Sequence, residues 1–189
     1  VNSGKSTLLK NLTNSNVLIA EYPFTTKKPE VGILDYHGIK LQIVEIPAII
    51  NNFEDSEIGP SMLAIIKQSD LLIITFKNKD ELKLINNELA DIDLPRIYYY
   101  NQDDIKDLIW KNLNLIKVYT KQPSKKPDYP PIALKKNYVI RDLAENVHKD
   151  FLRKFDFARV WGHSKFQGQR VGLKYILQDE DIVEFHLKD

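Results

Sequence analysis

The 189-residue chain has no cysteine, and this absence excludes disulfides, thiolate zinc sites and cysteine nucleophiles. Long apolar runs are lacking as well. The longest ones, such as residues 71–76, stop far short of the roughly 20 residues that a membrane-spanning helix needs. No signal-peptide pattern opens the sequence. We therefore expect a cytoplasmic protein without a membrane partner.

The chain also lacks an excess of charge of one sign, because its net charge is only +1. The charge is nevertheless uneven along the sequence. Residues 1–116 hold 12 Lys and Arg against 16 Asp and Glu, whereas residues 117–189 hold 15 against 10. Any attraction to polyanions such as RNA is therefore expected in the C-terminal part. The alternative is an ordinary solvated surface.

The pattern of apolar and turn-forming residues predicts two small domains. In the first part, expected strands and helices alternate, as an α/β architecture requires. The expected helices follow Gly4-Lys5-Ser6 directly and lie at residues 61–68, 80–89 and 103–113. The expected strands lie at residues 30–36, 39–46, 71–76 and 97–100, with His37-Gly38 as a hairpin turn between the first two.

The second part begins near Leu115, ahead of the Pro- and Lys-rich stretch 122–131. Its patterns predict a small α+β sheet with one helix across it. The expected strands lie at residues 118–120, 132–134, 158–161 and 182–187, and the expected helix lies at residues 140–154.

The opening residues VNSGKST match the last part of a phosphate-binding loop, G-x-x-x-x-G-K-[ST]. In that motif backbone N–H groups surround the phosphates, Lys reaches the β and γ oxygens, and the Ser hydroxyl holds Mg²⁺. Gly4, Lys5 and Ser6 fill the last three positions, whereas the first Gly would fall before Val1. The alternative is a plain helix N-terminus capped by Ser3.

Asn2 stands in the pattern G-x-x-N-x-G-K-S, where an amide oxygen can turn toward the phosphates. Such an oxygen can coordinate a monovalent cation, which makes K⁺ a candidate cofactor.

Four segments of the chain, 2–13, 21–50, 105–129 and 156–184, resemble the Obg-related GTPases in the right order. They are most similar to the developmentally regulated GTP-binding (DRG) proteins. The resemblance implies a P-loop GTPase-like α/β sheet over residues 1–115, N-terminally incomplete and internally shortened. It also implies a ubiquitin-like β-grasp module, the TGS domain, over residues 116–189.

The resemblance implies roles for individual residues, with GTP or GDP and Mg²⁺ as cofactors. Lys5 would contact the β and γ phosphates, and a threonine of switch I would reach the metal when a γ-phosphate is present. The implied phosphate-binding residues are Asn2, Ser3, Gly4, Lys5, Ser6 and Thr7. The implied metal ligands are Ser6, Thr25, Thr26 and Glu45, and the implied switch II is Pro47, Ala48 and Ile49.

The stretch VEIPAII departs from the D-x-P-G motif of the family at two positions. Glu45 replaces the Asp that holds Mg²⁺ through a water, and Ala48 replaces a Gly that lets a backbone N–H approach the γ-phosphate. Ile49 stands where Ras-like proteins keep a water-orienting Gln, so hydrolysis must be organised otherwise. Both replacements are expected to weaken the switch.

The guanine-reading motif N-K-x-D of the family is not found in its expected place. Asn78-Lys79-Asp80-Glu81 fits superficially, but it follows the strand expected at residues 71–76, where the family has a different loop. From residue 92 to residue 101 the chain is expected to skip the family's next strand, the inserted small domain and the motif that follows. The base reader is therefore unassigned.

Basic residues of the second part are candidates for a surface that contacts the ribosome, tRNA or other RNA, or a regulatory protein. The alternative for each is solvated surface charge. The candidates are Lys125, Lys126, Arg153, Lys154 and Arg170.

Three hypotheses follow. In the first, the protein binds GTP, hydrolyses it slowly with Mg²⁺ as a conformational switch, and is associated with translation. In the second, it is a degenerate pseudo-GTPase that acts only through its TGS module. In the third, it is a fragment of a competent GTPase, because loss of a buried first strand would cost several kcal/mol against a typical stability of about 5 to 15. We prefer the first function with the third explanation, which makes it a GTP hydrolase if the site is intact.

Overall fold

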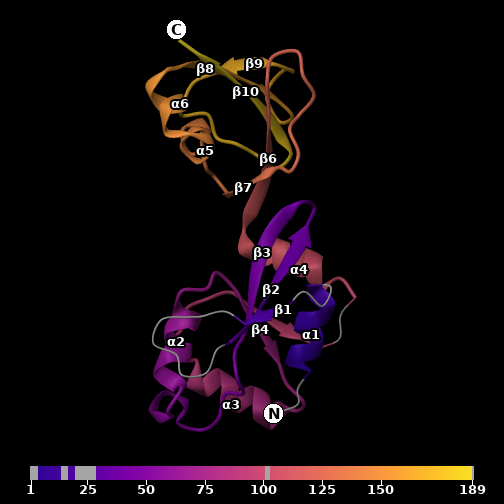
Figure 1. Ribbon diagram of the computed structural model, residues 1–189, viewed down its shortest axis with the longest axis vertical. Helices are drawn as coiled ribbons and strands as arrows, with labels where there is room; N and C mark the ends of the chain where they lie inside the picture. The colour runs from indigo at the N-terminus through magenta and orange to yellow at the C-terminus, as the bar shows by residue number, and fades with distance from the viewer. Residues whose placement is uncertain (1–3, 14–16, 20–28, 101–102, 189) are drawn as a thin grey trace. The chain divides into compact units, whose positions relative to one another are not determined.

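The computed structural model describes residues 4–13, 17–19, 29–100 and 103–188 (Figure 1). The chain divides into two compact units, one made of residues 1–36 and 40–113 and the other of residues 37–39 and 114–189. None of the helices in these described ranges is long and apolar enough to cross a membrane.

The first unit opens with a helix followed by an antiparallel sheet. Helix α1 (Lys5–Leu12) begins directly after Gly4, and its leucines, at helical spacing, are buried. Strands β1 (Val17–Ile19), β2 (Glu30–Tyr36) and β3 (Ile39–Glu45) pair in that order. His37 (φ 51°) and Gly38 (φ 86°) join β2 to β3. Two successive positive φ angles are typical of the tight turns that match strand twist, so the predicted hairpin is confirmed.

The rest of the first unit alternates helices and strands. After the 3₁₀ helix η1 (Phe53–Asp55) come α2 (Gly59–Lys67), β4 (Leu72–Thr75), α3 (Lys79–Glu88), β5 (Arg96–Tyr99) and α4 (Ile105–Leu113). Strands β4 and β5 are parallel neighbours, with Leu72 opposite Arg96. Strand β5 confirms the strand expected at residues 97–100.

Two apolar clusters hold the first unit together. One joins η1, α2, β4 and α3 around Phe53, Met62 and Ile74. The other joins α1, β2, β5 and α4, where Leu8 and Leu34 pack with residues such as Ile97. Among the described strands, β1–β2–β3 and β4–β5 form two separate sheets.

The second unit is a five-stranded sheet with helices on one face. Its strands are β6 (Leu115–Lys121), β7 (Ile132–Lys135), β8 (Phe155–Trp161), β9 (Gln169–Val171) and β10 (Asp181–Leu187), in the order β7-β6-β10-β8-β9. Strand β10 is parallel to β6 and antiparallel to β8. The helices are α5 (Ile140–Val147) and α6 (Lys149–Arg153), which Figure 1 shows next to each other. Ile140 and Leu143 of α5 are fully buried with Val118, Val160 and Val183 of the sheet.

The single helix predicted at residues 140–154 is wrong, because two helices occupy this range. His148 between them has extended backbone angles (φ −169°, ψ 139°), and its Nδ1 accepts a hydrogen bond of 3.2 Å from the Asp150 N–H. The imidazole therefore caps the second helix and separates it from the first. The short strands β1 and β9 were not predicted either.

Candidate nucleotide site

The N-terminus of α1 and the last residue of β3 meet at one point. Ser6 in the first turn of α1 donates its hydroxyl hydrogen to Glu45, with 2.8 Å between Ser6 Oγ and Glu45 Oε1. Gly4, directly before the helix, has left-handed backbone angles (φ 84°, ψ 11°), which few residues other than glycine adopt easily. The fold thus joins two of the predicted metal ligands.

The second carboxylate oxygen of Glu45 does not share this hydrogen bond. Glu45 Oε2 is buried and, within the described ranges, has no hydrogen-bond partner. A buried acceptor without a donor is unfavourable by about 1–3 kcal/mol. Mg²⁺ prefers hard oxygen ligands such as a hydroxyl and a carboxylate. The orphaned oxygen beside a serine hydroxyl therefore fits a divalent cation.

Lys5 lies next to this pair and is half-buried. No salt bridge links it to any residue that the structure describes. A cation at a helix N-terminus, near N–H groups that attract anions, is suited to a phosphate. Thr7 is exposed on the same turn. Asn2, Ser3, Thr25 and Thr26 lie outside the described residues.

The predicted switch II residues Pro47, Ala48 and Ile49 follow β3 in a stretch without regular secondary structure, and all three are half-buried. Ile49 packs against the apolar cluster around Phe53. Its side chain therefore belongs to the core, and it offers no polar atom that would orient a water.

Glu88 of α3 fastens the segment that follows. Its two carboxylate oxygens accept hydrogen bonds from the N–H groups of Asn52 (3.0 Å) and Phe53 (2.9 Å). Two bonds to one carboxylate hold the start of η1 against α3. The end of the switch II segment is thus anchored to a helix.

The NKDE sequence, residues 78–81, forms the N-terminal cap of α3. Asn78 caps α3, because its Oδ1 accepts a hydrogen bond of 2.9 Å from the Glu81 N–H. Glu81 Oε2 in turn accepts one of 2.7 Å from the Lys77 N–H. This backbone hydrogen bond is the main reason why the pKa of Glu81 is lowered. The amide and the carboxylate therefore close a helix N-terminus rather than face a base.

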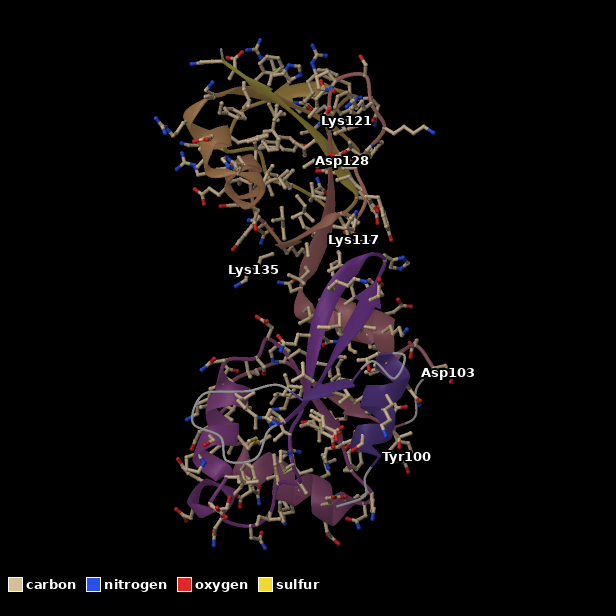
Figure 2. All side chains as sticks on the ribbon, in the orientation of Figure 1. Tyr100, Asp103, Lys117, Lys121, Asp128 and Lys135 are labelled. Carbon is tan, nitrogen blue, oxygen red and sulfur yellow. The ribbon has the colours of Figure 1, made fainter. Side chains whose placement is uncertain are left out.

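A second stretch with N-x-x-D spacing was not predicted as a base reader from the sequence. Residues 101–104 read NQDD and come directly after β5. The first two lie outside the described residues, whereas Asp103, labelled in Figure 2, and Asp104 are exposed before α4. Gln102 replaces the usual Lys of the motif. The signal that would have revealed it is its place after the strand that pairs with β4.

The candidate RNA-binding residues lie on separate elements and all are exposed. Lys125 and Lys126 are in the loop after β6, Arg153 and Lys154 are at the end of α6, and Arg170 is on β9. Arg153 lies 3.9 Å from Asp150, and Arg170 lies 3.8 Å from Asp156. The candidates therefore come from three separate segments of the second unit.

Comparison with known protein families matches both parts of the chain. Residues 1–102 match the model of the 50S ribosome-binding GTPase family, and residues 116–187 match the TGS domain. The chain belongs to this GTPase family. Membership implies a guanine nucleotide as the ligand and confirms the predicted combination of a P-loop GTPase fold and a TGS domain.

Similar proteins occur in an archaeon, a plant and a yeast. An uncharacterised GTP-binding protein of Methanocaldococcus jannaschii is 26% identical over 98% of this chain and 75% of its own length. Developmentally-regulated G-protein 3 of Arabidopsis thaliana is 26% identical over 96% of this chain and 78% of its own length. Ribosome-interacting GTPase 1 of Saccharomyces cerevisiae is 24% identical over 95% of this chain and 78% of its own length. These names confirm the resemblance to the DRG proteins.

The first of these alignments spans 295 positions, more than the 189 residues of this GTPase. The relative therefore carries residues inside the matched span that this chain lacks. This agrees with the internal shortening that the sequence predicts.

Proposed function

We propose that this protein is a DRG-type switch that binds GTP and hydrolyses it slowly with Mg²⁺. One observation carries the assignment of the site. Ser6 Oγ lies 2.8 Å from Glu45 Oε1 at the N-terminus of α1, and Glu45 Oε2 is buried beside it without a partner among the described residues. A bound Mg²⁺ would neutralise charge on the phosphates.

The residues of this chain take the following roles in the proposal. Ser6 and Glu45 hold the metal, and Lys5 contacts the β and γ phosphates. Backbone N–H groups at the start of α1 bind phosphate oxygens. The remaining predicted residues of the loop and of switch I complete the site, with K⁺ as a candidate ligand of Asn2. They are Ser3, Thr7, Thr25 and Thr26.

Slow hydrolysis follows from the switch II segment. Ile49 is packed in the core, and neither Pro47 nor Ala48 offers a side chain that can orient a water. The attacking water must then be positioned by the backbone or by groups outside this segment. Enzymes that lack an orienting side chain depend on an external stabiliser for fast turnover.

Guanine recognition is assigned to the stretch after β5. An Asp carboxylate can accept two hydrogen bonds from the guanine edge, and Asp104 occupies the last position of the N-x-x-D spacing. Asp104 is exposed, and it lies at the carboxyl end of a parallel strand, where ligands of open α/β sheets bind. We assign Asp104 as the base reader on these grounds.

The cellular role proposed here is association with translation in the cytoplasm. The name of the yeast relative describes a GTPase that interacts with the ribosome. The excess of basic residues in the second unit favours contact with RNA there. In this proposal the GTPase unit sets the state of the switch, and the TGS domain makes the contact.

The test is a titration of the full chain with fluorescent GDP and GTP analogues, with and without Mg²⁺, and with ATP as competitor. We expect micromolar binding that requires Mg²⁺ and prefers guanine. The variant Lys5→Ala should weaken binding about tenfold or more, because a charged contact to phosphate is lost. Lys10→Ala, on the exposed last turn of the same helix, is the matched control.

Two further variants test the assigned roles. Glu45→Ala should remove the effect of Mg²⁺ on affinity, and Asp104→Ala should reduce the preference for guanine over adenine. If a demonstrably folded chain binds no nucleotide, the proposal is wrong and the TGS domain alone carries the function.

A further inference from the structure

The hairpin of β8 and β9 places two arginines directly opposite each other. Arg159 and Arg170 are cross-strand partners, between the pairs Ala158–Val171 and Val160–Gln169. Ala158 and Val160 are fully buried in the core. Because side chains alternate along a strand, both arginines project from the face of the sheet that the core does not use.

Arg159 lies between Arg170 on β9 and Glu184 on β10, and the Glu184 carboxylate is already paired with Lys121 and His186. Arg159 is exposed, and no described carboxylate forms a salt bridge with it. Like charges directly opposite each other destabilise a sheet. Arg170 repels Arg159 on one side while Glu184 attracts it on the other, and a bound anion across the two arginines would reduce their repulsion.

Arg170 is held in place by an aromatic column. Its guanidinium carbon lies 3.9 Å from the centre of the Phe157 ring, and that ring stacks on His186 at 4.2 Å with 10° between the planes. Its side chain is still 65% exposed, and its contact with Asp156 is long, at 3.8 Å. A guanidinium that is already ordered loses less entropy when it binds, and its planar fork matches two phosphate oxygens.

The turn of the same hairpin adds an exposed aromatic ring. Phe166 is 64% exposed. Its carbonyl accepts hydrogen bonds from Gln169 N–H (3.2 Å) and from the Ser164 hydroxyl (2.9 Å), so the turn that carries it is tied to itself. A phenyl ring held in solvent in the turn of the hairpin that carries the two arginines can stack on a base of a strand whose phosphates those arginines bind.

We propose that the β8–β9 hairpin binds single-stranded RNA. Arg159 and Arg170 contact the phosphate backbone, and Phe166 stacks on a base. The inference rests on the proposed contact between the TGS domain and RNA, and it assigns that contact to a surface that shares only Arg170 with the basic residues predicted from the sequence. An acidic peptide would satisfy the arginines but would leave Phe166 without a role, so RNA is the better occupant.

The test measures binding of a short fluorescent single-stranded RNA to the full chain over a range of salt concentrations. The double variant Arg159→Gln, Arg170→Gln should weaken binding about tenfold or more, and each lost phosphate contact should lower the salt slope by about 0.7. Phe166→Ala should weaken RNA binding without changing that slope, because stacking releases no counterions. A second double variant, Lys125→Gln with Lys126→Gln, serves as the control and should bind RNA nearly normally.

A thermal unfolding experiment provides a readout that does not involve RNA. Arg159→Gln alone should leave the Tm of the second unit nearly unchanged, because it removes both the repulsion from Arg170 and the attraction of Glu184. A variant that binds RNA less well and keeps its Tm supports a binding role for the arginine, whereas one that loses RNA binding only together with a lower Tm contradicts it.

Three outcomes would overturn the inference. If the lysine variant loses RNA binding and the arginine variant does not, the TGS domain contacts RNA through the loop instead. If polyglutamate displaces the RNA and also requires Phe166, the surface is a peptide site. If the folded chain binds no RNA but still binds GTP, the contact with RNA is wrong and the nucleotide function stands.

Discussion

Glu184 on β10 is a buried carboxylate between two basic side chains. It is 5% exposed, Lys121 Nζ lies 3.0 Å from its Oε2, and His186 Nε2 lies 2.7 Å from its Oε1. Burial alone would raise the pKa of Glu184, but the hydrogen bonds from Lys121 and His186 outweigh burial and hold the pKa below the usual 4.5. The carboxylate is therefore charged in the folded protein.

A depressed native pKa makes stability depend on pH in a definite direction. The stabilisation is present above the unfolded pKa of about 4.5 and is lost as the pH falls through the lower native value. We expect the unfolding free energy of the second unit to decrease as the pH drops below about 4.5. Glu184→Gln should remove this part of the decline and destabilise the unit by about 1–3 kcal/mol at pH 7, because Lys121 loses its hydrogen-bonded carboxylate partner.

Urea denaturation at several pH values checks this prediction. Glu145→Gln is the matched control, because Glu145 is exposed on α5 and forms no salt bridge with any residue that the structure describes. If the unfolding free energy of Glu184→Gln decreases as steeply at acid pH as that of the unmodified chain, Glu184 is not the group responsible.

Among the secondary-structure elements, α3 begins with an amide cap, Asn78, whose NKDE sequence resembles a guanine-reading motif. Asn78 accepts a hydrogen bond of 2.9 Å from the Glu81 N–H. Asn78→Ala should lower the unfolding free energy of the first unit by about 1 kcal/mol and leave the preference for guanine unchanged. Asn87→Ala, on an exposed position of the same helix, should be nearly neutral. Loss of guanine preference in Asn78→Ala at normal stability would restore NKDE as the base reader.

The elements that could be predicted are those whose signal is local. Three leucines at helical spacing indicate α1, and His37-Gly38 between two β-rich runs indicates the β2–β3 hairpin. The break between α5 and α6 could not be predicted, because it depends on the imidazole of His148 capping the next turn. The three-residue strand β9 is too short to show a period, and its pairing with β8 is a long-range property.

The candidate site could be predicted from the sequence only in part. The resemblance to GTPases places Ser6 and Glu45 in one site, and the structure brings them within 2.8 Å, although 39 residues separate them. Their role as metal ligands stays a prediction. Asp104 could not be predicted from the motif, because Gln102 replaces its Lys and the better match, NKDE, lies earlier in the chain at a helix cap. Only the pairing of β5 with β4 reveals which strand the motif should follow.

At the scale of the whole molecule, the two units have separate cores. The clusters around Phe53 and Leu34 lie in the first unit, and the cluster around Val118 lies in the second. The chain has two tryptophans, and each unit holds one of them, Trp110 on α4 and Trp161 on β8. Their fluorescence therefore reports on the two units separately.

We expect two unfolding transitions that respond to different ligands. A ligand that binds only the folded state stabilises it by RT ln(1 + [L]/Kd), about 2.7 kcal/mol at a concentration of 100 Kd. GDP with Mg²⁺ should shift the transition reported by Trp110, and single-stranded RNA should shift the one reported by Trp161. The variants Trp110→Phe and Trp161→Phe assign each signal in urea unfolding. If GDP shifts both transitions equally, the two units unfold as one, and the nucleotide and RNA contacts are then thermodynamically linked through the fold.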